Sequence, residues 1–263
     1  MNTSAHYWRR PSDRLSLAGN DVHVWIAALD QPAAAIEQLA EILSDGEERI
    51  AERFCFDRDK RRYIAARGLL RSIVAKYYLG VEPGRLEFSY GSHGKPCLSR
   101  KLGGGTLCFN QSDSNGLALY AFAQDHEVGV DIEYMRTMTD AKDIVDGCFS
   151  EHEKRAFDSV ADEDKTEAFF NCWTRKEAFI KAIGLGLHFP LDRFDVSFVP
   201  GEPARLLRLA GWPEEVCRCS WTLMGFTPKN GYKGALAIKS TECKVSYWRF
   251  PGLDPQSLDR LSR

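Results

Sequence analysis

The amino-acid sequence predicts an α+β protein built from two similar halves. Two features support this interpretation. The order of a strand, then helices, then further strands occurs twice along the chain. Each half contains one long helical segment, at residues 58–79 and at residues 163–183. The halves meet near residues 120–127, so we expect an N-terminal half at 1–123 and a C-terminal half at 124–263.

The first half opens with a predicted strand at 22–28 and a helix at 33–43. The segment 58–79 is predicted to be a helix that stops at Gly80, because its apolar side chains recur mostly every three or four residues. These side chains are Ile64, Leu70, Ile73, Val74 and Tyr77. Short strands are expected at 86–90, 106–110 and 116–123.

The second half opens with a predicted strand at 127–133. Ser150 and Glu153 have the spacing of a capping box, which predicts a helix from there to about residue 160. A longer helix follows at 163–183 and ends at Gly184. The remaining strands are expected at 194–199, 204–209, 219–226, 233–238 and 244–250.

Composition limits the classes of function. Apolar residues make up 44% of the 263 residues and charged residues 27%, as in soluble globular proteins. A net charge of −2 argues against a general nucleic-acid binder. The sequence shows neither a long apolar run nor a secretory signal, so we expect no membrane association and a cytoplasmic location. The eight scattered cysteines are interpreted as reduced thiols.

The strand at 127–133 carries two carboxylates. Asp131 and Glu133 are two residues apart, so both lie on one face, while Val128, Val130 and Ile132 face a core. Adjacent carboxylates raise one another's pKa unless a cation lies between them. Mg²⁺ suits such a pair, because it commonly binds one or two carboxylates together with substrate phosphates. The alternative is a solvated face of an edge strand, which is the commoner meaning of an isolated D-x-E.

The helix at 163–183 carries Glu177 and Lys181 on the same face as Trp173. They could form an ordinary surface ion pair. The aromatic side chains of this helix indicate instead that it is largely buried, and charges on a buried helix need partners or a function. The aromatic residues are Phe169, Phe170, Trp173 and Phe179.

Three segments of the first half could bind anions. Residues 58–71 contain six basic side chains, of which Arg58 and Arg62, with Lys60 or Arg61, can form one cationic patch for phosphate. Gly94-Lys95-Pro96 is a turn that displays one lysine, and residues 110–114 offer hydroxyl groups. A solvated face or a plain turn is the commoner role of any one of these segments.

Together, these motifs resemble the Sfp-type 4′-phosphopantetheinyl transferases over about residues 53–194. The strongest elements are GVDIE at Gly129–Glu133 and W-x-x-K-E-A-F-x-K-x-x-G-x-G-L at Trp173–Leu187. Supporting elements are Gly94-Lys95-Pro96, F-N-x-S-x-S at Phe109–Ser114, and Phe149-Ser150-x-x-Glu153. The two strongest motifs in this order form a highly specific combination.

The resemblance implies a pseudo-dimer of two α/β halves with the active site at their interface, working as a monomer. The implied reaction transfers the 4′-phosphopantetheine group of coenzyme A to a serine of an acyl or peptidyl carrier protein, requires Mg²⁺ and releases adenosine 3′,5′-bisphosphate. The N-terminal half would hold the nucleotide, and the C-terminal half would bind the metal and carry out the chemistry. Cationic and apolar residues near 135–139, or the next helix, would dock the carrier.

The resemblance also implies residue roles. Asp131, Glu133 and Glu177 would hold Mg²⁺, and Lys181 would neutralise phosphate charge with help from Lys176. Either Glu177 or Glu153 would take the serine proton, and this choice stays open. The coenzyme A contacts implied in the first half are Arg62, His93, Gly94, Lys95, Pro96 and Ser112.

One position departs from the family pattern. Asp113 stands where the family has a histidine that faces the 3′-phosphate of coenzyme A. We therefore expect tolerance of dephospho-coenzyme A or weaker affinity for coenzyme A. The main alternative to a transferase is a non-catalytic module of the same fold that binds coenzyme A or a carrier protein. Another Mg²⁺-dependent nucleotide enzyme is a weaker alternative, since the sequence lacks a G-x-x-x-x-G-K-[ST] loop.

Overall fold

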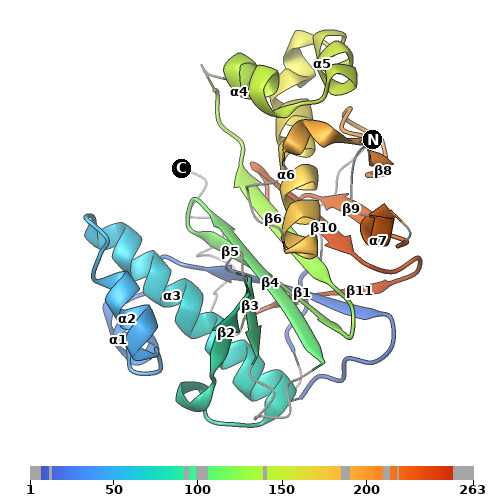
Figure 1. Cartoon of the computed structure of the whole chain (residues 1–263). Helices are drawn as coiled ribbons and strands as arrows, with labels where there is room; N and C mark the ends of the chain where they lie inside the picture. Colours follow the sequence, from blue (N-terminus) through green and yellow to red (C-terminus); the bar gives the residue numbers. More distant parts are fainter. Residues whose placement is uncertain are drawn as a thin grey trace.

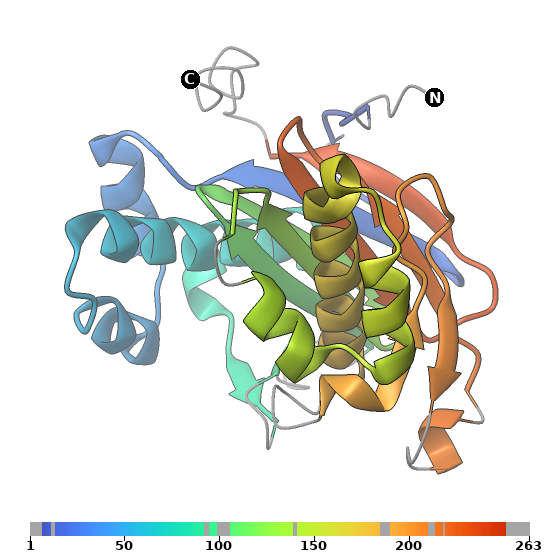
Figure 2. The same cartoon turned by 90° about the horizontal axis from the view of Figure 1, so that it is seen from above.

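The structure is a computed structural model, which describes residues 7–11, 14–91, 95–98, 106–138, 141–184, 190–209, 214–217 and 219–250. Its mixture of helices and largely antiparallel sheets confirms the predicted α+β class. The two main sheets pack face to face, and one long helix covers the outer face of each (Figures 1 and 2). The fold therefore has helix, sheet, sheet and helix layers, separated by three apolar cores.

The sheet of the first half has the strand order β11-β1-β5-β4. Strand β1 (Asp21–Ala28) pairs antiparallel with β5 (Leu117–Gln124), which pairs antiparallel with β4 (Leu107–Ser114). The other edge of β1 pairs in parallel with β11 (Lys244–Arg249). The last strand among the described residues thus lies in the sheet of the first half, although it comes after the predicted division at residue 123. That division stays a prediction.

The outer face of this sheet is covered by α3 (Asp57–Ile73), which continues as a π-helix (Val74–Leu79) to Gly80 in the left-handed conformation. The helix predicted at 58–79 is thereby confirmed, and its apolar face packs on Trp25 and Tyr120. The remaining short elements of this half are α1 (Ala33–Ala40), α2 (Asp45–Ala51), a 3-10 turn (Pro83–Arg85), and the paired strands β2 (Phe88–Tyr90) and β3 (Pro96–Leu98).

A buried ion cluster joins α2 to α3. Glu47 is 2% exposed and binds Arg67 and Arg71, each through oxygen-to-nitrogen distances of 2.7 Å. Arg71 also donates to the carbonyls of Pro83 and Leu86. Two of the six basic residues in segment 58–71 are therefore structural and do not contribute to a phosphate-binding patch.

The sheet of the second half has the order β6-β10-β9, with β6 (Val128–Tyr134), β10 (Tyr232–Ile238) and β9 (Thr222–Phe226) antiparallel. Helix α6 (Lys165–Ile183) lies on its outer face. Gly129 permits a close approach, because a Cβ atom there would lie 2.1 Å from the Ala178 carbonyl oxygen and 2.3 Å from the Ala182 nitrogen. This contact fixes α6 against β6.

Smaller elements complete the second half. They are α4 (Ala141–Cys148), α5 (Glu151–Asp158), 3-10 turns at Asp162–Asp164 and Leu191–Arg193, β7 (Phe194–Val196) paired with β8 (Leu206–Leu209), and α7 (Glu214–Cys217). The capping box of Ser150 and Glu153 is confirmed at the start of α5. Three helices, α2, α4 and α7, were not predicted from the sequence. Among the described helices, none is both long and apolar enough to cross a bilayer.

Candidate active site

The candidate site lies where β4 and β6 run side by side and the two sheets meet. These strands belong to different sheets, and in the described residues side chains connect them. Ser112 Oγ donates to Asp131 Oδ1 at 2.8 Å, and Ser114 Oγ donates to Glu133 Oε2 at 2.8 Å. Each carboxylate of β6 therefore has a hydroxyl of the other half as its partner.

The alternation predicted for β6 is confirmed. Val128, Val130 and Ile132 are buried in the core between the sheets. Asp131 and Glu133 lie on the opposite face, which α6 covers. Both carboxylates are thus placed between a strand of the first half and a helix of the second.

Helix α6 adds Glu177 and Lys181 to these carboxylates. Lys181 Nζ lies 2.6 Å from Asp131 Oδ1 and 2.9 Å from Ser112 Oγ. Glu177 is 7% exposed, and its pKa responds to the charges of Asp131, Glu133 and Lys181. We call Ser112, Asp131, Glu133, Glu177 and Lys181 the seam cluster. Helical spacing alone would favour a surface ion pair between Glu177 and Lys181. In the structure, Lys181 pairs with Asp131 instead.

The electrostatics of the seam cluster favour a bound cation. Burial, together with the charges of Asp131 and Glu133, raises the pKa of Glu177 to about 7. Burial and the charge of Asp131 also raise the pKa of Glu133. Burial disfavours the charged amine of Lys181, but its pKa is raised because the charge and hydrogen bond of Asp131 outweigh that effect. The site therefore holds more carboxylates than Lys181 can neutralise.

Two oxygens of the seam cluster identify where such a cation would be bound. Asp131 Oδ2 and Glu177 Oε1 are buried and have no hydrogen-bond partner in the described part of the chain. Leaving such atoms unpaired is costly. Within the described ranges, no three acidic, histidine or cysteine side chains are already arranged around an ion position. The donor set still fits Mg²⁺ in chemistry, since it offers hard carboxylate oxygens in need of positive charge.

Arg62 and Lys95, which the resemblance implies in nucleotide binding, have internal partners. Arg62 makes a two-point contact with Asp30 at 2.7 and 2.8 Å, which raises its pKa. Lys95 Nζ donates to Glu127 Oε2 at 2.8 Å and to the Ala182 carbonyl at 2.7 Å. Lys95 thereby ties the segment before β3 to the end of α6.

The structure describes some of the other residues that the resemblance implies in nucleotide binding. Pro96 begins β3, whereas His93 and Gly94 lie outside the described residues. Asp113 is exposed on β4, and alternation directs it away from the face of Ser112 and Ser114. Desolvation by surrounding protein raises the pKa of Asp113, while the charges of Lys181 and Arg62 oppose that shift. Asp113 is therefore within electrostatic reach of both cations.

Glu153 and Lys176 are not brought to the seam cluster. They form a buried ion pair at 2.7 Å, with side chains 0% and 1% exposed. Glu153 Oε1 accepts from the Val196 nitrogen, and Lys176 Nζ donates to the carbonyls of Leu191 and Phe194. Because these partners saturate both side chains, the structure gives them the role of fixing α5, α6 and β7 together. These contacts hold both side chains away from the seam cluster, and the roles of Glu153 as a base and of Lys176 as a phosphate contact stay predictions.

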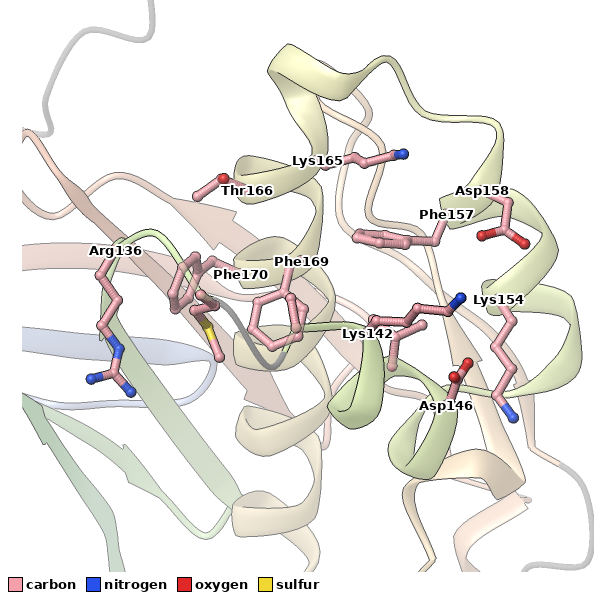
Figure 3. A pocket seen from close by; sticks show the side chains of 13 residues that line it. Arg136, Lys142, Asp146, Lys154, Phe157, Asp158, Lys165, Thr166, Phe169 and Phe170 are labelled. Atoms are coloured by element: carbon pink, nitrogen blue, oxygen red, sulfur yellow. The ribbon is translucent and has the colours of Figure 1, made fainter.

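A groove extends from the seam cluster over α6. One part, of about 580 Å³, is lined by Ser114, Glu133, Trp173 and neighbouring residues. The second part, of about 540 Å³, lies between α4, α5 and α6. The two parts share Arg136, Met138, Phe169 and Phe170. In Figure 3, Phe157, Phe169 and Phe170 project into the second part, with lysines around it.

The F-N-x-S-x-S motif contains Ser114 but did not indicate its contact with Glu133, and the docking region expected near 135–139 contributes Arg136 and Met138 to this groove. The contact of Ser114 could have been found, because Ser114 shares the alternating face of Ser112 on the strand before a two-residue turn. The groove depends on how α4 and α5 pack beside α6, and the pattern of the chain carried no signal for α4.

Comparisons with known proteins find similar sequences over most of the chain. The family model for the 4′-phosphopantetheinyl transferase superfamily matches residues 127–236, and the model for the 4′-phosphopantetheinyl transferase N-terminal region matches residues 30–124. The chain is 36% identical to the 4′-phosphopantetheinyl transferase HetI of Nostoc sp., over 93% of this chain and 99% of the relative. It is 29% identical to the 4′-phosphopantetheinyl transferase Sfp of Bacillus subtilis, over 61% of this chain and 68% of the relative.

A similar match occurs in an animal. The L-aminoadipate-semialdehyde dehydrogenase-phosphopantetheinyl transferase of Rattus norvegicus is 31% identical, over 64% of this chain and 57% of the relative.

Proposed function

The chain belongs to the 4′-phosphopantetheinyl transferase superfamily, and from that premise we propose that it transfers the 4′-phosphopantetheine group of coenzyme A to a serine of an acyl or peptidyl carrier protein. The observation that carries this proposal is the seam cluster. Three carboxylates and one lysine from a strand and a helix meet beside a groove at the junction of the two sheets. The pyrophosphate of coenzyme A needs positive charge beside it, which Lys181 and a cation held by the carboxylates would provide. The carrier serine needs a base to take its proton.

In the proposed reaction, the carrier serine oxygen attacks the phosphorus that bears the pantetheine group. A new P–O bond forms, and the bond from this phosphorus to the oxygen of the adenosine phosphate breaks. Adenosine 3′,5′-bisphosphate leaves with the electron pair, and the serine proton passes to a base. Lys181 stabilises negative charge on the phosphates. This electrostatic interaction is stronger in a site shielded from water than in bulk solvent.

Glu177 is the base that the structure favours. Its carboxylate lies in the seam cluster beside the groove, in reach of the charges of Asp131, Glu133 and Lys181. Glu153 is buried against Lys176 and cannot reach a substrate hydroxyl without breaking that pair. Asp131, Glu133 and Glu177 would hold Mg²⁺, which would supply positive charge to the pyrophosphate.

The nucleotide would be held by Arg62, Lys95 and Ser112, with His93, Gly94 and Pro96 beside them. Arg62 and Lys95 must then share their charge between phosphate and their internal carboxylates, Asp30 and Glu127. Asp113 adds a further negative charge near Arg62. These carboxylates support the expectation that the enzyme tolerates dephospho-coenzyme A.

The carrier would dock over the groove of α4, α5 and α6. Four basic side chains and two acidic ones line its second part, together with apolar side chains at its base. Figure 3 shows Lys142, Lys154 and Lys165 around Phe157 and Phe169. An apolar surface with basic side chains around it suits an acidic partner, which would compete with Glu151 for Lys154 and with Asp162 for Lys165. The other end of the groove reaches Glu133.

The direct test is intact-mass spectrometry of an apo carrier protein incubated with coenzyme A, Mg²⁺ and this protein. A mass gain of one phosphopantetheine group is expected. Asp131→Asn should lower the transfer rate by at least about a hundredfold, because it removes a carboxylate that would hold Mg²⁺ against the reacting phosphates. Glu87→Gln, a change of an exposed carboxylate away from the cluster, serves as the matched control.

Two results would contradict the proposal. Binding of coenzyme A with no mass gain across several carriers would indicate a non-catalytic module. Near wild-type transfer by Asp131→Asn would remove Asp131 from the chemistry.

A further inference from the structure

Strand β4 presents three polar side chains at alternate positions, and all three reach β6. Asn110 Oδ1 accepts from the Val130 nitrogen at 2.9 Å. Ser112 and Ser114 then donate to Asp131 and Glu133, as described above. Side chains thus set the register between two strands that lack a backbone ladder in the described residues.

Ser114, like Ser112, uses its hydroxyl both as a donor and as an acceptor, and it is the serine that contacts Glu133. Its Oγ donates to Glu133 Oε2 at 2.8 Å and accepts from the Tyr134 nitrogen at 3.1 Å. A hydroxyl held from two directions can rotate little, so it fixes the rotamer of the carboxylate it serves. Glu133 is half-buried and borders the groove, where an unrestrained side chain could turn toward solvent.

The backbone of Ser114 is held as well. Asn115 and Gly116 follow with φ of 44° and 83°, the left-handed values of a tight two-residue hairpin turn. Tyr232 Oη, on β10, donates to the Asn115 carbonyl at 2.9 Å. The turn is therefore attached to the sheet that carries Glu133, which keeps the serine and the carboxylate at a constant separation.

We propose that Ser114 is a positioning residue that aims Glu133 at the divalent cation of the transfer reaction. The inference rests on the proposed function, because it needs a cation in the seam cluster. The unpartnered oxygens of Asp131 and Glu177, both more than nine-tenths buried, independently indicate where that cation is required. Ser114 acts through Glu133 and does not itself contact the reacting atoms.

The test compares Ser114→Thr with Ser114→Val in the full chain. The two variants have nearly the same shape, and both suit a strand, but only threonine keeps the hydroxyl. Mn²⁺ binding is measured by electron paramagnetic resonance, with Mn²⁺ alone and with coenzyme A but no carrier. Ser114→Val should bind Mn²⁺ about 10–100 times more weakly than wild type, as for other residues that orient metal ligands, and Ser114→Thr should bind nearly as well.

Two further readouts separate positioning from loss of structure. The apparent KM for Mg²⁺ should rise in Ser114→Val, while the KM for coenzyme A and the melting temperature stay close to those of Ser114→Thr. Ser89→Ala, which removes an exposed strand hydroxyl of the same half, should change none of these values.

Each outcome is decisive. Equal Mn²⁺ affinity in Ser114→Thr and Ser114→Val would overturn the role of Ser114 and leave the proposed transferase intact. Wild-type transfer without measurable Mn²⁺ binding would overturn both this inference and the metal part of the proposed function.

Discussion

His23 is a buried histidine of β1, and its environment keeps it neutral. It is 5% exposed, and its Nδ1 lies 3.0 Å from Tyr78 Oη, which also accepts from Trp25. Burial lowers the pKa of His23 from 6.5 to about 4, with Asp21 opposing the shift. The folded protein therefore binds fewer protons than the unfolded chain between these two pKa values, and its stability falls as the pH drops through this range.

We expect this histidine to contribute to acid destabilisation. Between pH 7 and pH 5, protonation of the unfolded chain should lower the free energy of unfolding by about 2 kcal/mol, since one pKa unit corresponds to about 1.4 kcal/mol. Urea unfolding of wild type and of His23→Gln at both pH values measures the difference. If the two proteins lose the same stability on acidification, His23 does not titrate as described.

Glu47 illustrates a charge whose role is structural. Glu47→Gln leaves the buried guanidinium groups of Arg67 and Arg71 without a full countercharge, so we expect a loss of about 3–5 kcal/mol in the free energy of unfolding. Glu48→Gln, a change of the exposed neighbour, is the control. Chemical denaturation provides the measurement, and equal stability of the two variants would show that solvent already compensates these arginines.

At the scale of elements, the contact of β6 with α6 decides the geometry of the seam cluster. Asp131 and Glu133 come from the strand, and Glu177 and Lys181 come from the helix. Gly129 sets the distance between them, because any side chain there would meet the backbone of α6. The glycine of the GVDIE motif thus serves the site without providing a functional atom.

Gly129→Ala should therefore separate the helix from the strand. We expect a loss of about 1–3 kcal/mol in stability from overpacking, together with weaker Mn²⁺ binding. Gly147→Ala on α4 is the control, since a Cβ atom there meets no atom within 4 Å. Thermal unfolding and Mn²⁺ titration measure both effects, and an unchanged Mn²⁺ affinity would mean that α6 adjusts without moving its carboxylate.

At the scale of the whole molecule, β11 closes the sheet of the first half. It pairs in parallel with β1 from Lys244 to Arg249, and Trp248 packs against the core of α3 and its sheet. Strand β11 thus attaches residues 244–249 to the half that is implied to hold the nucleotide.

A chain that ends at Cys243 should consequently be much less stable than one that ends at Phe250, although both keep every residue of the seam cluster. The shorter chain exposes the edge of β1 and loses the packing of Trp248. Melting temperature and hydrogen exchange of β1 amides would measure the effect. Equal protection of β1 in the two chains would show that β11 is dispensable for this sheet.

The local pattern of the chain was sufficient for much of the fold and the site. Alternation on β6 predicted that Asp131 and Glu133 share a face opposite the core, and helical spacing placed Glu177 and Lys181 on one side of α6. These predictions succeed because strand and helix geometry repeat over a few residues, so the relevant information is local.

Contacts between distant segments could not be predicted in this way. Lys176 and Glu177 are neighbours in sequence, yet one is sealed in a buried pair with Glu153 and the other reaches the seam cluster. Their faces of α6 differ by about 100°, and what lies against each face depends on packing. The capping box of Ser150 and Glu153 could be predicted because it is a local pattern. The burial of Glu153 could not, because it depends on contacts with distant residues.

The sequence by itself determined the α+β class, the long helices, the alternating face of β6 and the motifs of the transferase family. The tertiary structure alone decided that Lys181 pairs with Asp131, that Ser114 holds Glu133, that Arg62 and Lys95 already have carboxylate partners, and that β11 joins the first sheet. The reason is physical. Periodicity is set by backbone geometry over a few residues, whereas the partner of a charged side chain is set by whichever distant group folding brings within about 3 Å of it.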